Sequence, residues 1–209
     1  MDSIWLLPLT LLAIVLSWPA WRTPVARWSA ERNSPQALTL QPDRISLVRV
    51  AEPAWKNPYP RDTADLQLAA AGFVESGAYV VREVAGLTLG LYAHPAERAY
   101  AVIYDHARSG AWVEFVTRYD DGTLANYATL EPMDVDVPEG SVHVAAPELS
   151  VGELWKRMLA ERPQRPMREC SRAAAARDFE RGYAESMEHH KRIAPAGTET
   201  PRDDVEQVA

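Results

Sequence analysis

The chain has 209 residues and a formal net charge of −7, with 22 lysines and arginines against 29 aspartates and glutamates. This acidic balance argues against a nucleic-acid partner, because phosphate binding requires clustered basic side chains. Hydrophobic residues at 47% and charged residues at 24% are the proportions of a globular protein, so most of the chain is expected to fold. The single cysteine, Cys170, excludes a fold that depends on an internal disulfide and is typical of a reducing compartment.

Residues 4–21 form an uncharged and strongly apolar segment. As a helix, a segment of this length spans about 27 Å at ~1.5 Å per residue, close to the ~30 Å of hydrocarbon in a bilayer. Trp5 lies at one end and Trp18 and Trp21 at the other, which matches the preference of tryptophan for membrane interfaces. The segment therefore predicts one transmembrane anchor, and the membrane is the first expected partner.

A cleaved signal peptide is the alternative for this segment, but its features are poor. No basic residue precedes the apolar run, whereas a signal peptide begins with positive charge. Cleavage after Ala26 or Ala30 would put Pro24 or Trp28 at a position that favours small residues. An uncleaved anchor is therefore favoured.

Charge around the anchor predicts its orientation. Arg22, Arg27 and Arg32 follow the span, while Asp2 and the α-amino group precede it. Positively charged flanks stay on the cytoplasmic side, so we expect a single-pass membrane protein whose C-terminal domain is cytoplasmic.

The rest of the chain predicts an α+β domain behind a proline-rich connector. A short helix is expected from Asp62 to Ala71, with Gly72 at its end, and an antiparallel β-meander of about five strands follows. The predicted strands cover residues 77–81, 87–94, 99–106, 111–119 and 124–130. Residues 44–50 alternate in polarity and are expected to form an edge strand.

Turn lengths predict which side chains share a face of this sheet. Four-residue loops at 95–98 and 107–110 and an even loop around Asp121-Gly122 bring most large apolar side chains together. The predicted core face holds Leu87, Leu89, Leu91, Val102, Tyr104, Val113, Phe115, Leu124 and Leu130. The predicted second face holds Tyr92, Ile103, Trp112, Glu114, Val116 and Arg118.

Two helices are predicted after the sheet. Ser150 and Glu153 have the spacing of a capping box, Trp155 lies on the apolar stripe that follows, and Pro163 ends this helix. The second helix is expected from about residue 171 to residue 192. The chain thus divides into five predicted parts: an anchor at 1–21, a connector at 22–60, the α+β domain at 61–163, a C-terminal helix packed on it at 164–194, and a disordered tail at 195–209.

Sequence motifs give no catalytic residue, no metal site and no cofactor. His94 and His106 are expected at opposite ends and on opposite faces of one hairpin, too far apart to share a ligand. Glu185 and His189 have the spacing to hold a metal weakly, but a histidine at a helix C-terminus is favoured by the helix dipole alone.

Two further candidates are also more readily explained as structural. Cys170 precedes a helix, where a thiol pKa is lowered, but no other feature marks it as a nucleophile. Asp134 and Asp136 resemble half of a calcium loop, and the later ligands are not at the required spacing.

The predicted second face is the candidate binding surface, centred on Tyr92, Trp112, Glu114 and Arg118. It is too apolar for a solvated face, so either the C-terminal helix covers it or it binds a ligand, and the helix is favoured.

The pattern resembles membrane-anchored bacterial proteins of uncharacterised function over residues 66–163. The resemblance rests on Ala71-Gly72-Phe73, residues 92–106, the Trp112 strand with its turn at 119–123, and Leu154-Trp155. It implies no activity. Two hypotheses remain: a membrane-tethered domain that binds a ligand or a protein partner without chemistry, and a membrane-anchored hydrolase or metal-dependent enzyme with dispersed residues. They differ in whether catalytic polar groups converge in a pocket.

Overall fold

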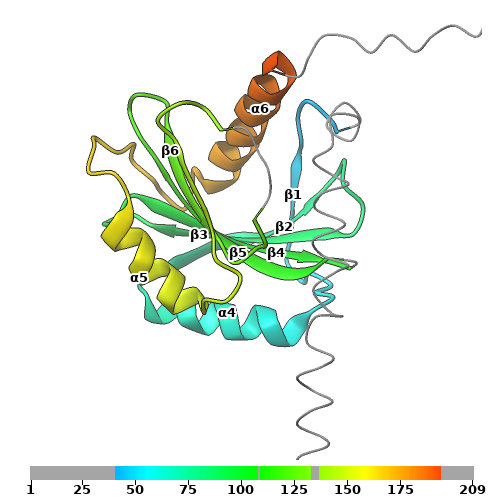
Figure 1. Cartoon of the computed structure of the whole chain (residues 1–209). Helices are drawn as coiled ribbons and strands as arrows, with labels where there is room; N and C mark the ends of the chain where they lie inside the picture. The colour runs from blue at the N-terminus through cyan, green and yellow to red at the C-terminus, as the bar shows by residue number, and fades with distance from the viewer. Residues whose placement is uncertain (1–40, 108, 133–136, 194–209) are drawn as a thin grey trace, which may run out of the picture.

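The computed structural model describes residues 41–107, 109–132 and 137–193 (Figure 1). The predicted anchor, residues 22–40 of the connector, the tail and the acidic pair at 134 and 136 lie outside these ranges. Among the described helices, none is long and apolar enough to cross a membrane.

One seven-stranded sheet forms the centre of the described domain, with its strands in chain order. The strands are β1 (Leu47–Val50), β2 (Val74–Val81), β3 (Leu87–His94), β4 (Ala99–His106), β5 (Gly110–Arg118), β6 (Leu124–Ala128) and β7 (Val142–Ala145). Strands β1 to β6 pair antiparallel, and β7 pairs parallel to β6. The α+β class and the antiparallel sheet are confirmed, as is the edge strand β1, but β7 was not predicted.

Helices cover both faces of the sheet (Figure 1). Helices α4 (Pro58–Ala70) and α5 (Val151–Glu161) pack on one face, and α6 (Ala175–Ile193) lies across the other. Helix α4 begins earlier than predicted because prolines are compatible with a first helical turn, whose N–H groups have no helical partner. Two separate apolar clusters result, one on each side of the sheet.

Both predicted helix-end signals are confirmed. Gly72 has a φ of +92° after α4, and the N–H of Phe73 donates to the carbonyl of Leu68 at 3.0 Å. At α5 the N–H of Glu153 donates to Ser150 Oγ at 3.3 Å, and the N–H of Ser150 donates to Glu153 Oε2 at 2.9 Å. These local signals fix where the two helices meet the sheet.

The strand register is confirmed for β3–β4 and wrong for β4–β5. Leu91 lies opposite Val102 as predicted, but His106 lies opposite Gly110, so three residues rather than four connect β4 to β5. Gly110 has a φ of +78°, the left-handed conformation that closes a three-residue hairpin loop. A one-residue shift reverses every side chain of β5.

This reversal exchanges the two predicted faces along β5 alone. Val113 and Phe115 join the α4–α5 cluster, while Trp112 and Glu114 lie on the α6 face beside Val102. A second one-residue shift, which sets Arg118 opposite Leu124, returns β6 to its predicted face.

Candidate functional site

The structure brings together three of the four residues of the predicted binding surface. Trp112, Glu114 and Arg118 lie on the α6 face of β5. Tyr92 belongs to the opposite face, because the register of β5 relative to β3 is reversed. Its side chain is 2% exposed, and its hydroxyl donates to Asp65 Oδ1 at 2.8 Å, which ties α4 to the sheet.

Helix α6 covers this face, as the sequence favoured, and leaves a cavity of about 220 Å³ beneath it. We call this space the sheet–helix cavity. Its walls are largely aromatic and aliphatic. The sheet also contributes the polar side chains of Glu114, Arg118 and Asn126 to them. The wall includes Tyr100, Tyr104, Val116, Asn126, Phe179 and Tyr183, with Glu114 and Arg118.

Glu114 is the acidic side chain of the sheet in this cavity. The hydroxyl of Tyr104 donates to its Oε2 at 2.8 Å. Burial raises the pKa of Glu114, and interactions with Tyr104, Asn126 and Trp112 offset that rise only in part. Protein surrounds the carboxyl, although part of the side chain faces the cavity. The uncharged acid, which can donate a hydrogen bond, is therefore favoured over a wider pH range than in an exposed glutamate.

Asn126 supplies an unused hydrogen-bond acceptor in the same wall. It lies opposite Val116 on the neighbouring strand, and its Oδ1 is buried without a hydrogen-bond partner. An unsatisfied buried acceptor is unfavourable by roughly 1–3 kcal/mol, so a donor from a bound molecule would be stabilising there. Trp112 stacks on Tyr104 with ring centroids 4.7 Å apart, and its buried indole N–H lies close enough to Glu114 to lower the pKa of the carboxyl without meeting hydrogen-bond geometry.

Arg118 lies between the cavity and α6. Its guanidinium pairs with Glu185 at 2.8 Å and presses against Gly182, where an added Cβ would lie 1.6 Å from Nη2. A glycine inside a helix is destabilising by about 1 kcal/mol relative to alanine, so its presence at 182 has a packing reason. The glycine gives the arginine room against the helix backbone.

A second space of about 320 Å³, the arginine cleft, adjoins the sheet–helix cavity. The two share Tyr100, Arg118 and Asp178 in their walls. The hydroxyl of Tyr100 donates to Asp178 at 2.6 Å, and burial together with this bond raises the pKa of Tyr100. The other charged side chains of the cleft are Arg98, Arg168, Glu169 and Arg181. No sequence pattern predicted the cleft, because its arginines come from four separate segments.

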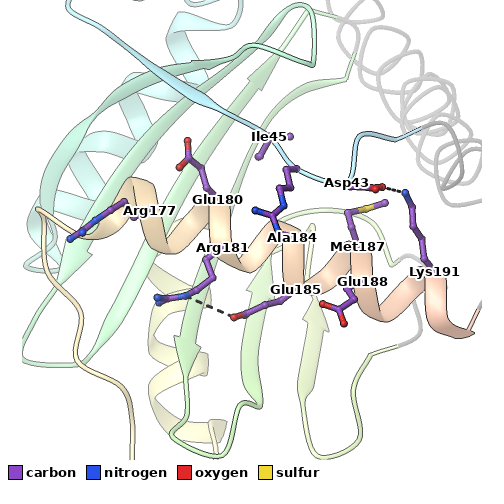
Figure 2. A pocket seen from close by; sticks show the side chains of 11 residues that line it. Asp43, Ile45, Arg177, Glu180, Arg181, Ala184, Glu185, Met187, Glu188 and Lys191 are labelled. Atoms are coloured by element: carbon purple, nitrogen blue, oxygen red, sulfur yellow. Dashed lines mark hydrogen bonds and ion pairs between the residues drawn. The ribbon is translucent and has the colours of Figure 1, made fainter.

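An open groove of about 670 Å³ on the outer side of α6 is a weaker candidate (Figure 2). Its charged side chains largely neutralise one another, as Figure 2 shows for Asp43 with Lys191 and for Arg181 with Glu185. Glu180 in its wall accepts the backbone N–H of Leu47 at 2.7 Å. These contacts hold α6 to the segment around β1.

His106 and Cys170 make structural contacts. His106 Nδ1 lies 2.9 Å from Ser109 Oγ, but Asp105 points to the other face, where its carboxylate binds the Asn57 side chain at 2.6 Å. A Ser–His–Asp relay is therefore not formed by these neighbours. Cys170 is buried, its thiol donates to the Ala99 carbonyl at 3.4 Å, and burial raises the pKa of the thiol.

The arrangement can bind and orient a small molecule through apolar walls, a buried acid, an unpaired amide oxygen and arginines at one end. Within the described ranges, no group of three or more histidine, cysteine, aspartate or glutamate side chains could hold a metal ion. Comparisons of the chain with protein-family models, with curated protein sequences and with solved protein structures give no match.

Proposed function

We propose that the protein is a membrane-anchored binding protein whose described domain holds a small, mainly apolar ligand in the sheet–helix cavity. The observation that carries this proposal is the unpaired Oδ1 of Asn126 in the wall beside Glu114. Small-molecule sites typically combine apolar walls with a few convergent polar groups. A hydroxyl or amide on the ligand would donate to Asn126 Oδ1, and a ligand hydroxyl would also meet the Glu114 carboxyl, which accepts when ionised and donates when protonated.

Membrane attachment through residues 4–21 and a cytoplasmic domain belong to the same proposal. They are supported by the apolar segment and by the arginines at 22, 27 and 32. A protein partner is the second binding candidate, because Tyr59 and Leu66 lie two helical turns apart on α4 and are 83% and 73% exposed.

The cavity volume of about 220 Å³ sets the size of a suitable test ligand. At the ~30 Å³ that a water molecule occupies in the liquid, it holds roughly seven waters, and because the bonded atoms of a ligand pack more closely than separate waters, a small phenol with slightly more atoms fits. Para-ethylphenol, an apolar body with one hydroxyl, is the first compound to titrate against the full-length protein by ligand-observed NMR, with empty lipid nanodiscs as the blank.

Saturable binding of para-ethylphenol is the expected result. Val116→Trp fills the cavity from its floor and should abolish binding, whereas Leu66→Trp, on the exposed side of α4, should leave it unchanged. Asn126→Leu should reduce the preference for para-ethylphenol over ethylbenzene, since the acceptor is removed. Binding that persists in Val116→Trp would show that the cavity is not the site.

Acid–base catalysis is the second candidate function, favoured by the raised pKa of Glu114 in a cavity. It predicts turnover of an ester of para-ethylphenol that is lost in Glu114→Gln while para-ethylphenol still binds. Binding of the ester without turnover would contradict the catalytic function and support the binding function.

A further inference from the structure

Strand β5 presents an acidic, an apolar and a positively charged side chain in turn to the sheet–helix cavity. They are Glu114, Val116 and Arg118. Alternate residues of a strand point to one face at ~3.3 Å per residue, so the first and last Cα atoms lie about 13 Å apart. The polarity of the site therefore changes along β5. One end offers hydrogen bonds, the middle is apolar, and the other end is basic.

The basic end is continued by the arginine cleft. The backbone N–H of Arg168 donates to the Arg118 carbonyl at 2.8 Å, which places residue 168 beside the end of β5. The Nη1 of Arg98 donates to the carbonyl of Met167 at 2.7 Å, so the same short segment also holds Arg98. The cleft is thus assembled by residues 167 and 168.

Positively charged side chains outnumber negatively charged ones in the arginine cleft. Four arginines face it against the carboxylates of Glu169 and Asp178. Asp178 pairs with Arg181 at 2.6 Å, and Arg118 pairs with Glu185 at 2.8 Å, so the excess positive charge comes from Arg98 and Arg168 against Glu169. Within the described part of the chain, the Arg168 side chain has no ion-pair partner.

We infer that the ligand is an organic carboxylate with an aromatic or short aliphatic body, its carboxylate held by Arg168 and its neighbours in the cleft and its body in the sheet–helix cavity. This inference rests on the proposed function. A guanidinium presents two N–H groups in the geometry of a carboxylate, and a pair of this kind is a strong hydrogen-bonded contact. A polar group at the far end of the body would reach Glu114 and Asn126.

The test compares para-hydroxyphenylpropionate with its neutral analogue para-hydroxyphenylpropanol on the full-length protein in nanodiscs at neutral pH. The acid should bind about tenfold or more tightly, the scale of one charge-assisted hydrogen bond. Arg168→Gln should remove most of that difference and leave the affinity for the alcohol unchanged. Arg157→Gln, a matched change in an ion-paired arginine of α5 on the other face, should alter neither affinity.

Binding of the alcohol keeps the two proposals separable. Equal affinities for acid and alcohol, both lost in Val116→Trp, would overturn the carboxylate inference and leave the proposed function intact. A preference for the acid that survives Arg168→Gln and Arg98→Gln would overturn the assignment to the cleft. Failure of both compounds to bind would contradict the cavity as a binding site and the inference with it.

Discussion

The Glu114 carboxyl lies beneath α6 at a position where the charged form is disfavoured. Burial raises its pKa above the ordinary value of 4.5, and the Tyr104 hydroxyl compensates only partly. In the unfolded chain the carboxyl ionises near the ordinary value, whereas in the folded protein it retains its proton to higher pH. Folding therefore becomes less favourable as pH rises from the unfolded pKa to the folded pKa.

Glu114→Gln should relieve this pH dependence, because the amide keeps the shape of the acid and carries no charge. The variant should gain stability relative to the native protein as pH rises above about 4.5, by about 1.4 kcal/mol for each unit by which the folded pKa exceeds the unfolded one. Urea midpoints of a fragment spanning residues 41–193, measured at pH 4 and pH 8, provide the check. A stability difference independent of pH would mean that the carboxyl ionises normally beneath α6.

At the scale of elements, α5 is the helix whose sequence and packing agree most closely. Its apolar stripe meets the sheet at Trp155, which is 6% exposed. The indole contacts Phe73 and Phe115, with ring centroids 4.8 Å and 5.2 Å away. His94 stacks on it at 5.7 Å. One side chain thus joins α5, the end of α4 and two strands.

Trp155→Ala should destabilise the domain by roughly 3–5 kcal/mol, because it removes a large side chain from a closed cluster. Trp155→Phe keeps an aromatic ring and should have a smaller effect. Denaturant unfolding of the same fragment measures both changes. An unchanged midpoint in Trp155→Ala would contradict the packing of α5 on the sheet.

Ser150→Ala should destabilise the domain by about 1 kcal/mol, since the N–H of Glu153 loses its acceptor at the start of α5. Ser150→Asp retains an acceptor and is the matched control, for which we expect a small change. If both variants unfold at the native midpoint, the cap contributes nothing measurable to stability.

Local signals predicted the elements better than the contacts between them. Gly72 and Ser150 carry their own turn and cap chemistry, so both helix ends were predicted from a few neighbouring residues. The predicted length of the β4–β5 loop was wrong by one residue. The segment up to Gly110 is compatible with a four-residue loop and also with a three-residue loop followed by a left-handed glycine. That single residue decided which side chains face α6.

The candidate site was predicted only in part, because it too depends on contacts between elements. Glu114 and Arg118 were identified from alternation along one strand, while Tyr92 was added through the incorrect register. Arg98 and Arg168 are 70 positions apart in the sequence. They meet through backbone contacts of residues 167 and 168, which no pattern in the sequence encodes.

At the scale of the whole molecule, membrane attachment stays a prediction from residues 4–21. Full-length protein should sediment with membranes and resist extraction by carbonate and by high salt. Deletion of residues 1–21 should release the domain into the supernatant. A mature N-terminus found near residue 27 or 31 would instead identify a secreted protein.

Strands β1 to β6 each pair with the strand before or after them in the chain, whereas α6 docks through contacts between the two ends of the described domain. The Tyr183 hydroxyl donates to the Pro42 carbonyl at 3.0 Å, and Glu180 accepts from the N–H of Leu47 at 2.7 Å. Pairings between neighbours close short loops, whereas contacts across more than a hundred residues have a larger loop-closure entropy to overcome. On the ribosome all seven strands emerge before α6, so the strands are available to pair before their last covering helix. Until α6 docks, the side chains around Glu114 are open to water, and the sheet–helix cavity does not exist because α6 supplies one of its walls.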